Sequence, residues 1–120
     1  MADYCLADSC LWLDYLTGKG KKEFLDQEIP LALSALSLFE IAKKLKEFNF
    51  PFKKIQYILR YLQEYNLILN VDSAISIHAI NFSEKLGAID ALLYATASAN
   101  ELPLFTRDND FRGLPNTHFI

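Results

Sequence analysis

Several features that would place a chain in a specialised class are scarce here. The two cysteines, Cys5 and Cys10, fit neither a disulfide framework nor a zinc-binding pattern, so we expect reduced thiols in a cytoplasmic protein. The first residues lack a basic segment, and Asp3, Asp8 and Asp14 interrupt the apolar stretch there, which argues against a signal peptide. No apolar run approaches the ~20 residues of a membrane span, so we expect no membrane partner.

Glycine and proline are also few, with four of each, and the chain has no repeat, low-complexity segment or linker. Its 120 residues predict a single domain over 1–120, long enough to bury a core but too short for two domains. The composition, 52% hydrophobic and 22% charged, is that of a globular protein. The net charge of -3 provides no general attraction to nucleic acid, so such binding would need a local basic patch or a bound cation.

Short apolar strands alternate with helices along the chain. We predict helices over 11–16, 21–28, 37–48, 73–86 and 88–100, with one more beginning at Pro51, and strands over 4–7, 29–33, 67–71, 102–106 and 117–120. Strands that are apolar on both faces are typical of parallel sheets covered by helices. The pattern therefore predicts an α/β fold with a central parallel sheet of four to five strands. In such sheets the functional crevice lies beyond the carboxyl ends of the strands.

Three candidate site acids each have an ordinary structural explanation. Asp8 follows the first predicted strand, where an Asp side chain often caps the next helix. Glu40 follows Ser37 at the S-x-x-E spacing of a capping box, which for Glu40 alone is the better interpretation. Asp108 would form an Asx turn after the fourth strand, with Asp110 simply solvated.

Asp90 is harder to explain in this way, because it is the only charged residue between residues 86 and 100. A helix that is apolar nearly all round is buried, and a carboxylate there needs a partner or its pKa rises. In the predicted sheet, Asp8 and Asp108 leave the carboxyl ends of strands, while Glu40 and Asp90 lie in the first turns of helices. Carboxylates that converge repel one another unless a hard cation joins them, so we predict a Mg²⁺ or Mn²⁺ site.

Four segments resemble the PIN domain in their order and spacing, and most of all the small VapC-type toxins within that family. They are Leu6-Ala7-Asp8-Ser9, Ser37-Leu38-Phe39-Glu40-Ile41, Asp90-Ala91-Leu92-Leu93-Tyr94-Ala95-Thr96-Ala97 and Leu104-Phe105-Thr106-Arg107-Asp108-Asn109-Asp110-Phe111. The resemblance covers essentially the whole chain, and the last two segments are the specific ones. The sequence departs from the family pattern in two places. Ala7 stands where a larger apolar residue is common, and the chain ends soon after the last segment.

The resemblance implies a three-layer α/β/α fold and a metal-dependent endoribonuclease that hydrolyses phosphodiester bonds of single-stranded or structured RNA. It also implies the toxin role of a type II toxin–antitoxin pair, with a cognate antitoxin and a homodimer as partners. The site residues it implies are catalytic acids at Asp8, Glu40, Asp90 and Asp108, metal ligands at Asp8, Asp90 and Asp108, and supporting residues at Ser9, Thr106 and Asp110.

Basic and aromatic residues suggest where partners bind. Candidate RNA contacts are Lys19, Lys21, Lys22, Lys43, Lys44, Lys46, Arg107 and Arg112. Taken one by one these are ordinary surface residues, and only Arg107 and Arg112 gain from flanking the acids. The stretch 47–65 has more aromatic residues than one small core needs, which predicts either a homodimer contact or a groove for an antitoxin peptide.

Two rival classes fit poorly and two remain open. An EF-hand loop would use Asp108, Asp110 and Gly113, but its twelfth position is Phe119, where calcium needs a bidentate Glu, and a strand precedes it. A receiver domain needs an Asp after the third strand and a Lys after the last strand. Asp72 follows the third predicted strand, but no such Lys is present, so this class fits poorly. A PIN scaffold that binds without cutting, and an RNA-processing nuclease that is not a toxin, remain alternatives.

Overall fold

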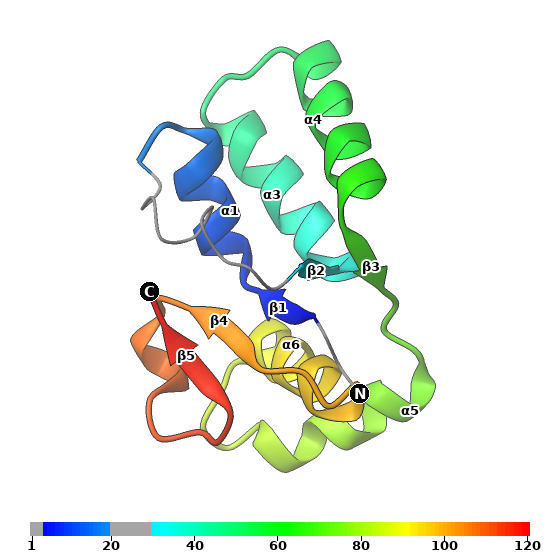
Figure 1. Ribbon diagram of the computed structural model, residues 1–120, viewed down its shortest axis with the longest axis vertical. Coiled ribbons are helices and arrows are strands. Elements are labelled where there is room, and N and C mark those ends of the chain that lie inside the picture. Colours follow the sequence, from blue (N-terminus) through cyan, green and yellow to red (C-terminus); the bar gives the residue numbers. More distant parts are fainter. Residues whose placement is uncertain (1–3, 20–29) are drawn as a thin grey trace.

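The computed structural model describes residues 4–19 and 30–120, and within them a parallel sheet forms the middle of the molecule (Figure 1). Its strand order is β3-β2-β1-β4-β5, and every neighbouring pair is parallel. The strands are β1 (Cys5–Ala7), β2 (Leu31–Ser34), β3 (Leu67–Leu69), β4 (Leu104–Thr106) and β5 (Thr117–Phe119). The predicted parallel α/β fold is therefore confirmed, with five strands.

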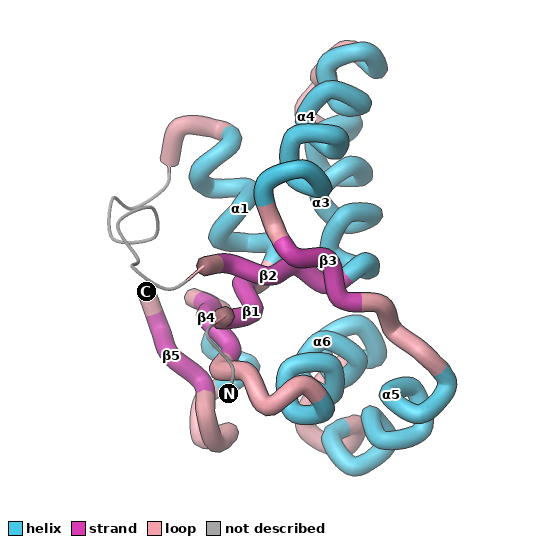
Figure 2. The backbone as a smooth tube through the Cα atoms, turned by 45° about the vertical axis from the view of Figure 1, so that its right-hand side comes forward, coloured by secondary structure: helices cyan, strands magenta, loops and turns pink. Residues whose placement is uncertain are grey.

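Helices cover both faces of this sheet, so that it lies between two helical layers (Figure 2). The described helices are α1 (Ser9–Leu16), α3 (Ala35–Glu47), α4 (Phe52–Tyr65), α5 (Ser73–His78) and α6 (Ala88–Ala99), with short 3₁₀ segments η1 (Ala79–Phe82) and η2 (Asn109–Phe111). Figure 1 shows α1, α3 and α4 on one side of the sheet and α5 and α6 on the other. None of the helices in the described part of the chain is long and apolar enough to cross a membrane.

Two apolar cores follow from the alternation of side chains along the strands. In β1, Cys5 and Ala7 face the core beneath α1, α3 and α4, while Leu6 faces the core that α5 and α6 cover. All three are fully buried, as are Leu62 of α4 and Leu104 of β4 in the two cores. The predicted three-layer arrangement is confirmed, because each face of the sheet has its own helical cover.

The sheet register determines where the functional crevice lies. Leu6 pairs with Leu104 and Ala7 with Phe105, so β1 and β4 end side by side at the centre of the sheet. The residues that follow these strands therefore emerge together, next to the start of α1 and of η2.

Helix boundaries differ from those that the sequence predicts, most consequentially in α3 and α5. Ser34 caps α3 by accepting a hydrogen bond from the Leu36 N–H at 3.1 Å, so the helix begins before Ser37 and no capping box forms there. Glu40 consequently lies in the second turn of α3 and not in the first. The helix predicted over 73–86 ends at His78 and continues only as the short 3₁₀ segment η1. The helix predicted over 21–28 lies outside the described residues.

Candidate active site

Three carboxylates meet beyond the carboxyl edge of the sheet. Asp90 lies in the first turn of α6, and Asp108 and Asp110 lie at the start of η2. Each of them offers one oxygen, and these oxygens lie within 4.8 Å of one another. A group of this size and chemistry suits a hard divalent cation. The metal set predicted from the sequence had Asp8 in place of Asp110, and Asp8 lies outside this trio.

Asp8 occupies the N-cap position of α1 but its side chain does not cap that helix. It is only 5% exposed, and its Oδ2 accepts a hydrogen bond from the Thr106 hydroxyl at 2.8 Å. The Ser9 hydroxyl lies 3.4 Å from Asp8 Oδ1 and also 3.4 Å from Glu40 Oε1, so its single proton serves one of them at a time. The ordinary capping explanation therefore fails for Asp8, whose charge acts on the crevice by raising the pKa of Asp90.

Thr106 connects the ends of the two central strands. Its side chain is fully buried, donates to Asp8 and accepts the backbone N–H of Asp108 at 3.0 Å. Asp108 in turn accepts the Asp110 N–H on Oδ1 at 2.9 Å, which is the Asx turn that the sequence suggested. That bond uses only one carboxylate oxygen, so Asp108 can shape its turn and still present Oδ2 to a cation.

The acids strongly influence one another. The pKa of Asp90 rises from 3.8 to about 6, chiefly because burial disfavours its charge and then because Asp8, Asp108, Glu40 and Asp110 lie near it. The pKa values of Asp8 and Glu40 also rise, each mainly through burial. Within the described residues no Lys or Arg forms an ion pair with any of the five acids. Either protons or a bound cation must therefore offset this repulsion.

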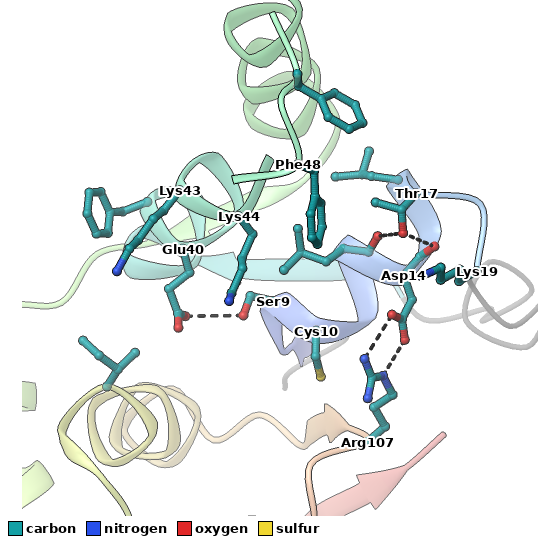
Figure 3. Close-up of a pocket in the computed structure, with 15 residues that line it drawn as sticks. Ser9, Cys10, Asp14, Thr17, Lys19, Glu40, Lys43, Lys44, Phe48 and Arg107 are labelled. Atoms are coloured by element: carbon teal, nitrogen blue, oxygen red, sulfur yellow. Dashed lines mark hydrogen bonds and ion pairs between the residues drawn. The ribbon is translucent and has the colours of Figure 1, made fainter. Parts of the chain in front are cut away.

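The two arginines that flank Asp108 are engaged by other protein groups. Arg107 forms a two-pronged ion pair with Asp14 of α1, in which Nη2 lies 3.0 Å from Oδ1 and Nε contacts Oδ2 (Figure 3). Arg112 donates to Asn109 Oδ1 at 3.0 Å, and its guanidinium lies 4.1 Å from the centre of the Phe119 ring. Their predicted contact with RNA remains a prediction, while their observed contacts brace the segment that carries the acids.

A pocket that the sequence does not predict opens beside the acids. Its volume is about 850 Å³, and Ser9 and Glu40 contribute to its wall (Figure 3). The cations Lys19, Lys43 and Lys44 also line it. The only signal in the sequence is that Glu40, Lys43 and Lys44 are spaced to share one helix face. Of the other candidate lysines, Lys21 and Lys22 lie outside the described residues.

A parallel α/β sheet with carboxylates beyond its central strands defines a class of proteins whose ligand site lies at that edge, where the carboxylates suit a hard cation by their chemistry. The chain belongs to the PIN domain family, whose family model matches residues 5–116. The family predicted from the four sequence segments is thus confirmed. A comparison with curated protein sequences finds no match.

Solved structures of toxin–antitoxin proteins share this fold. One is a toxin–antitoxin complex from Klebsiella pneumoniae, at 25% identity, a TM-score of 0.80 and coverage of 95% of each chain. Another is DNA-bound VapBC from Salmonella typhimurium, at 14% identity and a TM-score of 0.76, over 100% of this chain and 98% of that one. A third is FitAcB from Neisseria gonorrhoeae, at 18% identity and a TM-score of 0.71, over 97% and 96% of the two chains.

Proposed function

We propose that this chain is a metal-dependent endoribonuclease that hydrolyses phosphodiester bonds of RNA. The observation that carries the proposal is the set of carboxylates at the crevice of a PIN fold, in which oxygens of Asp90, Asp108 and Asp110 lie within 4.8 Å of one another. Asp8 and Glu40 belong to the same site, because the charge of each raises the pKa of Asp90. Five acids that form no ion pair with a Lys or Arg among the described residues are costly unless a metal ion uses them.

The proposed roles follow from the position of each side chain. Asp90 and Asp108 hold Mg²⁺ or Mn²⁺, together with Asp8, the sequence-predicted ligand, or Asp110, the one that the geometry adds. A bound divalent cation supplies an activated water and neutralises charge on the phosphate. Glu40 borders both the crevice and the pocket, and its raised pKa suits it to accept a proton there. Thr106 fixes the orientation of Asp8.

Asp90→Asn tests this proposal. The substitution keeps the size of the side chain but removes its charge, so we expect RNA cleavage in Mg²⁺ or Mn²⁺ to fall by about 10²-fold or more. EDTA should abolish cleavage by the parent protein. The matched control is Asp72→Asn, because Asp72 caps α5 by accepting the Ile75 N–H and Asn keeps that role. If Asp90→Asn folds and cuts RNA as fast as the parent, the proposed site is wrong.

We propose further that the nuclease is the toxin of a toxin–antitoxin pair in the cytoplasm. The support is the likeness to toxin–antitoxin proteins over nearly the whole chain, including the complex at 25% identity. Expression of the chain alone should then stop bacterial growth, and coexpression of an antitoxin encoded beside it should restore growth. Growth that the active nuclease leaves unchanged would favour an RNA-processing role.

Besides the complex with an antitoxin, we propose that the chain forms a homodimer. Tyr57, Tyr61 and Tyr65 form a stripe at helical spacing on α4, and Tyr57 and Tyr65 are 68% and 70% exposed. The Tyr61 and Tyr65 rings pack on each other with their centres 4.9 Å apart. An exposed aromatic stripe of this kind is typical of a protein interface. Light scattering should give twice the 13.7 kDa mass of one chain.

A further inference from the structure

The pocket beside the acids combines cations with exposed aromatic rings. It lies between α1 and α3 and shares Ser9 and Glu40 with the candidate active site (Figure 3). Whatever occupies it therefore lies directly beside the crevice in which a phosphodiester would react. Besides Lys19, Lys43 and Lys44, its lining includes Phe39, Phe48 and Phe50.

The lysines of α3 leave their positive charge available to a ligand. Lys43 and Lys44 lie three and four positions after Glu40, and Figure 3 shows all three side chains on the same side of α3. Among the described residues neither lysine pairs with Glu40, and Lys44 has only Glu47, at 3.8 Å. Both groups of that pair are more than half exposed, so it holds Lys44 weakly. Arg107, on the opposite wall, is instead neutralised by Asp14.

The aromatic rings offer flat apolar faces to solvent next to these charges. Phe39 is 70% exposed and Phe48 is 54% exposed, although both line the pocket. Figure 3 shows the Phe48 ring directed toward α1, with Lys44 beside it. Single-stranded nucleic acids are bound by this combination, in which bases stack on aromatic rings and phosphates lie near lysines.

We infer that this pocket binds an unpaired nucleotide of the substrate strand, next to the bond that the acids cut. The base stacks on Phe48, and Lys43 and Lys44 contact the flanking phosphates. This inference rests on the proposed ribonuclease function and adds a base-reading site to it. A polyanion fits better here than an apolar peptide, because three lysines line the pocket together with the aromatic rings, and Ser9 and Glu40 connect the pocket to the crevice.

Binding of RNA to the full chain tests this inference. The probes are a short labelled single-stranded RNA and the same RNA with abasic sites, measured by anisotropy with Ca²⁺ in place of Mg²⁺. We expect Phe48→Ala to raise the Kd of the intact RNA about tenfold and to leave that of the abasic RNA unchanged. Lys43→Ala combined with Lys44→Ala should lower the slope of log K against log salt by about 1.4, since each phosphate contact on a single strand contributes about 0.7.

Matched controls lie on α4, outside the pocket. Phe52 is 72% exposed and Lys53 is also exposed, so Phe52→Ala and Lys53→Ala remove the same chemical groups from another surface. Both should bind the two RNAs as the parent does. The inference is overturned if Phe48→Ala also binds both RNAs as the parent does, or if Phe52→Ala weakens binding equally.

Cleavage assays separate this inference from the proposed function. If the pocket variants keep parental RNA binding but escape inhibition by an antitoxin, the pocket is a protein site and the RNA assignment is wrong. Cleavage of RNA by the parent in Mg²⁺ would leave the proposed function standing in that case. A parent protein that neither binds nor cuts RNA would overturn both.

Discussion

At the scale of single residues, Thr106 determines how two of the acids are held. Its hydroxyl is the one described group that contacts both Asp8 and the Asp108 backbone, across 98 positions of sequence in the first case. The sequence identified it only through the family resemblance. No local pattern shows that a Thr at the end of β4 bonds to an Asp at the end of β1, because that contact depends on the register of the two strands.

Thr106→Val should impair the metal site without changing its shape. Valine has nearly the size of threonine, but it cannot donate to Asp8 or accept from the Asp108 N–H, and we expect a loss of about 1–3 kcal/mol in the free energy of unfolding. We also expect Mn²⁺ to bind more weakly, which calorimetry measures directly. The matched control is Thr96→Val, since Thr96 is equally buried but bonds only to the Leu92 carbonyl of its own helix. Equal Mn²⁺ affinity in both variants would contradict this role for Thr106.

Asp90 shows how far residue-level reasoning reaches. Its isolation in an apolar helix predicted that its pKa would rise unless a partner offset its charge, and the pKa does rise to about 6. Asp8 shows the limit of that reasoning. Its position at a helix start, taken alone, predicted a cap. The side chain does not cap α1 and instead accepts the Thr106 hydroxyl, a contact that depends on the pairing of β1 with β4.

At the scale of elements, α3 shows why helix boundaries were harder to predict than the helices themselves. The sequence has serines at 34 and 37, and the S-x-x-E pattern favoured the second. In the structure β2 runs directly into α3, and Ser34 is both the last strand residue, paired with Leu69, and the cap of the helix. Strand pairing therefore determines where the helix starts, and the sequence pattern at Ser37 does not reveal it.

The segment η2 carries two of the acids and is anchored by one side chain. Phe111 ends η2, is fully buried and packs in the core that α6 covers, which fixes the turn holding Asp108 and Asp110. The Lys85 ammonium, from the loop before α6, also donates to the Arg112 carbonyl at the end of this turn. The loop that leads into α6, and so to Asp90, is thereby connected to the turn that holds Asp108 and Asp110.

Phe111→Leu should loosen this anchor and so weaken metal binding. The smaller side chain leaves a gap worth about 1–3 kcal/mol in the free energy of unfolding, and we expect weaker Mn²⁺ binding because Asp108 and Asp110 lose their fixed geometry. Leu62→Ala is the control, since Leu62 is equally buried but lies in the other core, under α4. It should cost about 2–5 kcal/mol and leave the Mn²⁺ affinity of the folded protein unchanged. Parental affinity in Phe111→Leu would show that the turn holds without its anchor.

At the scale of the whole molecule, the fold brings acids from distant parts of the chain to one edge of the sheet. Asp8 and Asp108 follow neighbouring strands, Asp90 lies in the first turn of α6, and Glu40 lies on α3. Parallel topology is enough to predict this convergence, which is why the crevice was predictable from alternating strands and helices. The three carboxylates that lie closest together include Asp110, where the sequence predicted Asp8. This difference was not predictable, because it depends on side-chain directions within a 3₁₀ turn.

Convergence of these charges makes the stability of the metal-free protein depend on pH. Because the pKa of Asp90 rises from 3.8 to about 6 on folding, the folded protein binds more protons than the unfolded chain between these values. The contribution of Asp90 to the free energy of unfolding therefore falls as pH rises from about 4 to about 6, and stays low above that. The raised pKa values of Asp8 and Glu40 act in the same direction.

We therefore expect Asp90→Asn to raise the Tm of the EDTA-treated protein at pH 7 and to change it little at pH 4, where Asp90 is already neutral. Mg²⁺ or Mn²⁺ should reverse this order at pH 7, since a ligand at 100 times its Kd adds about 2.7 kcal/mol to the parent protein, which binds it. Calorimetric melts at both pH values, with and without metal, measure the difference in Tm between the parent and Asp90→Asn in each of the four conditions. Asp72→Asn is melted alongside as the control. A parent that melts above Asp90→Asn at pH 7 in EDTA would show that ionised Asp90 does not destabilise the metal-free fold, and a metal would then no longer be needed to explain how the folded protein holds this charge.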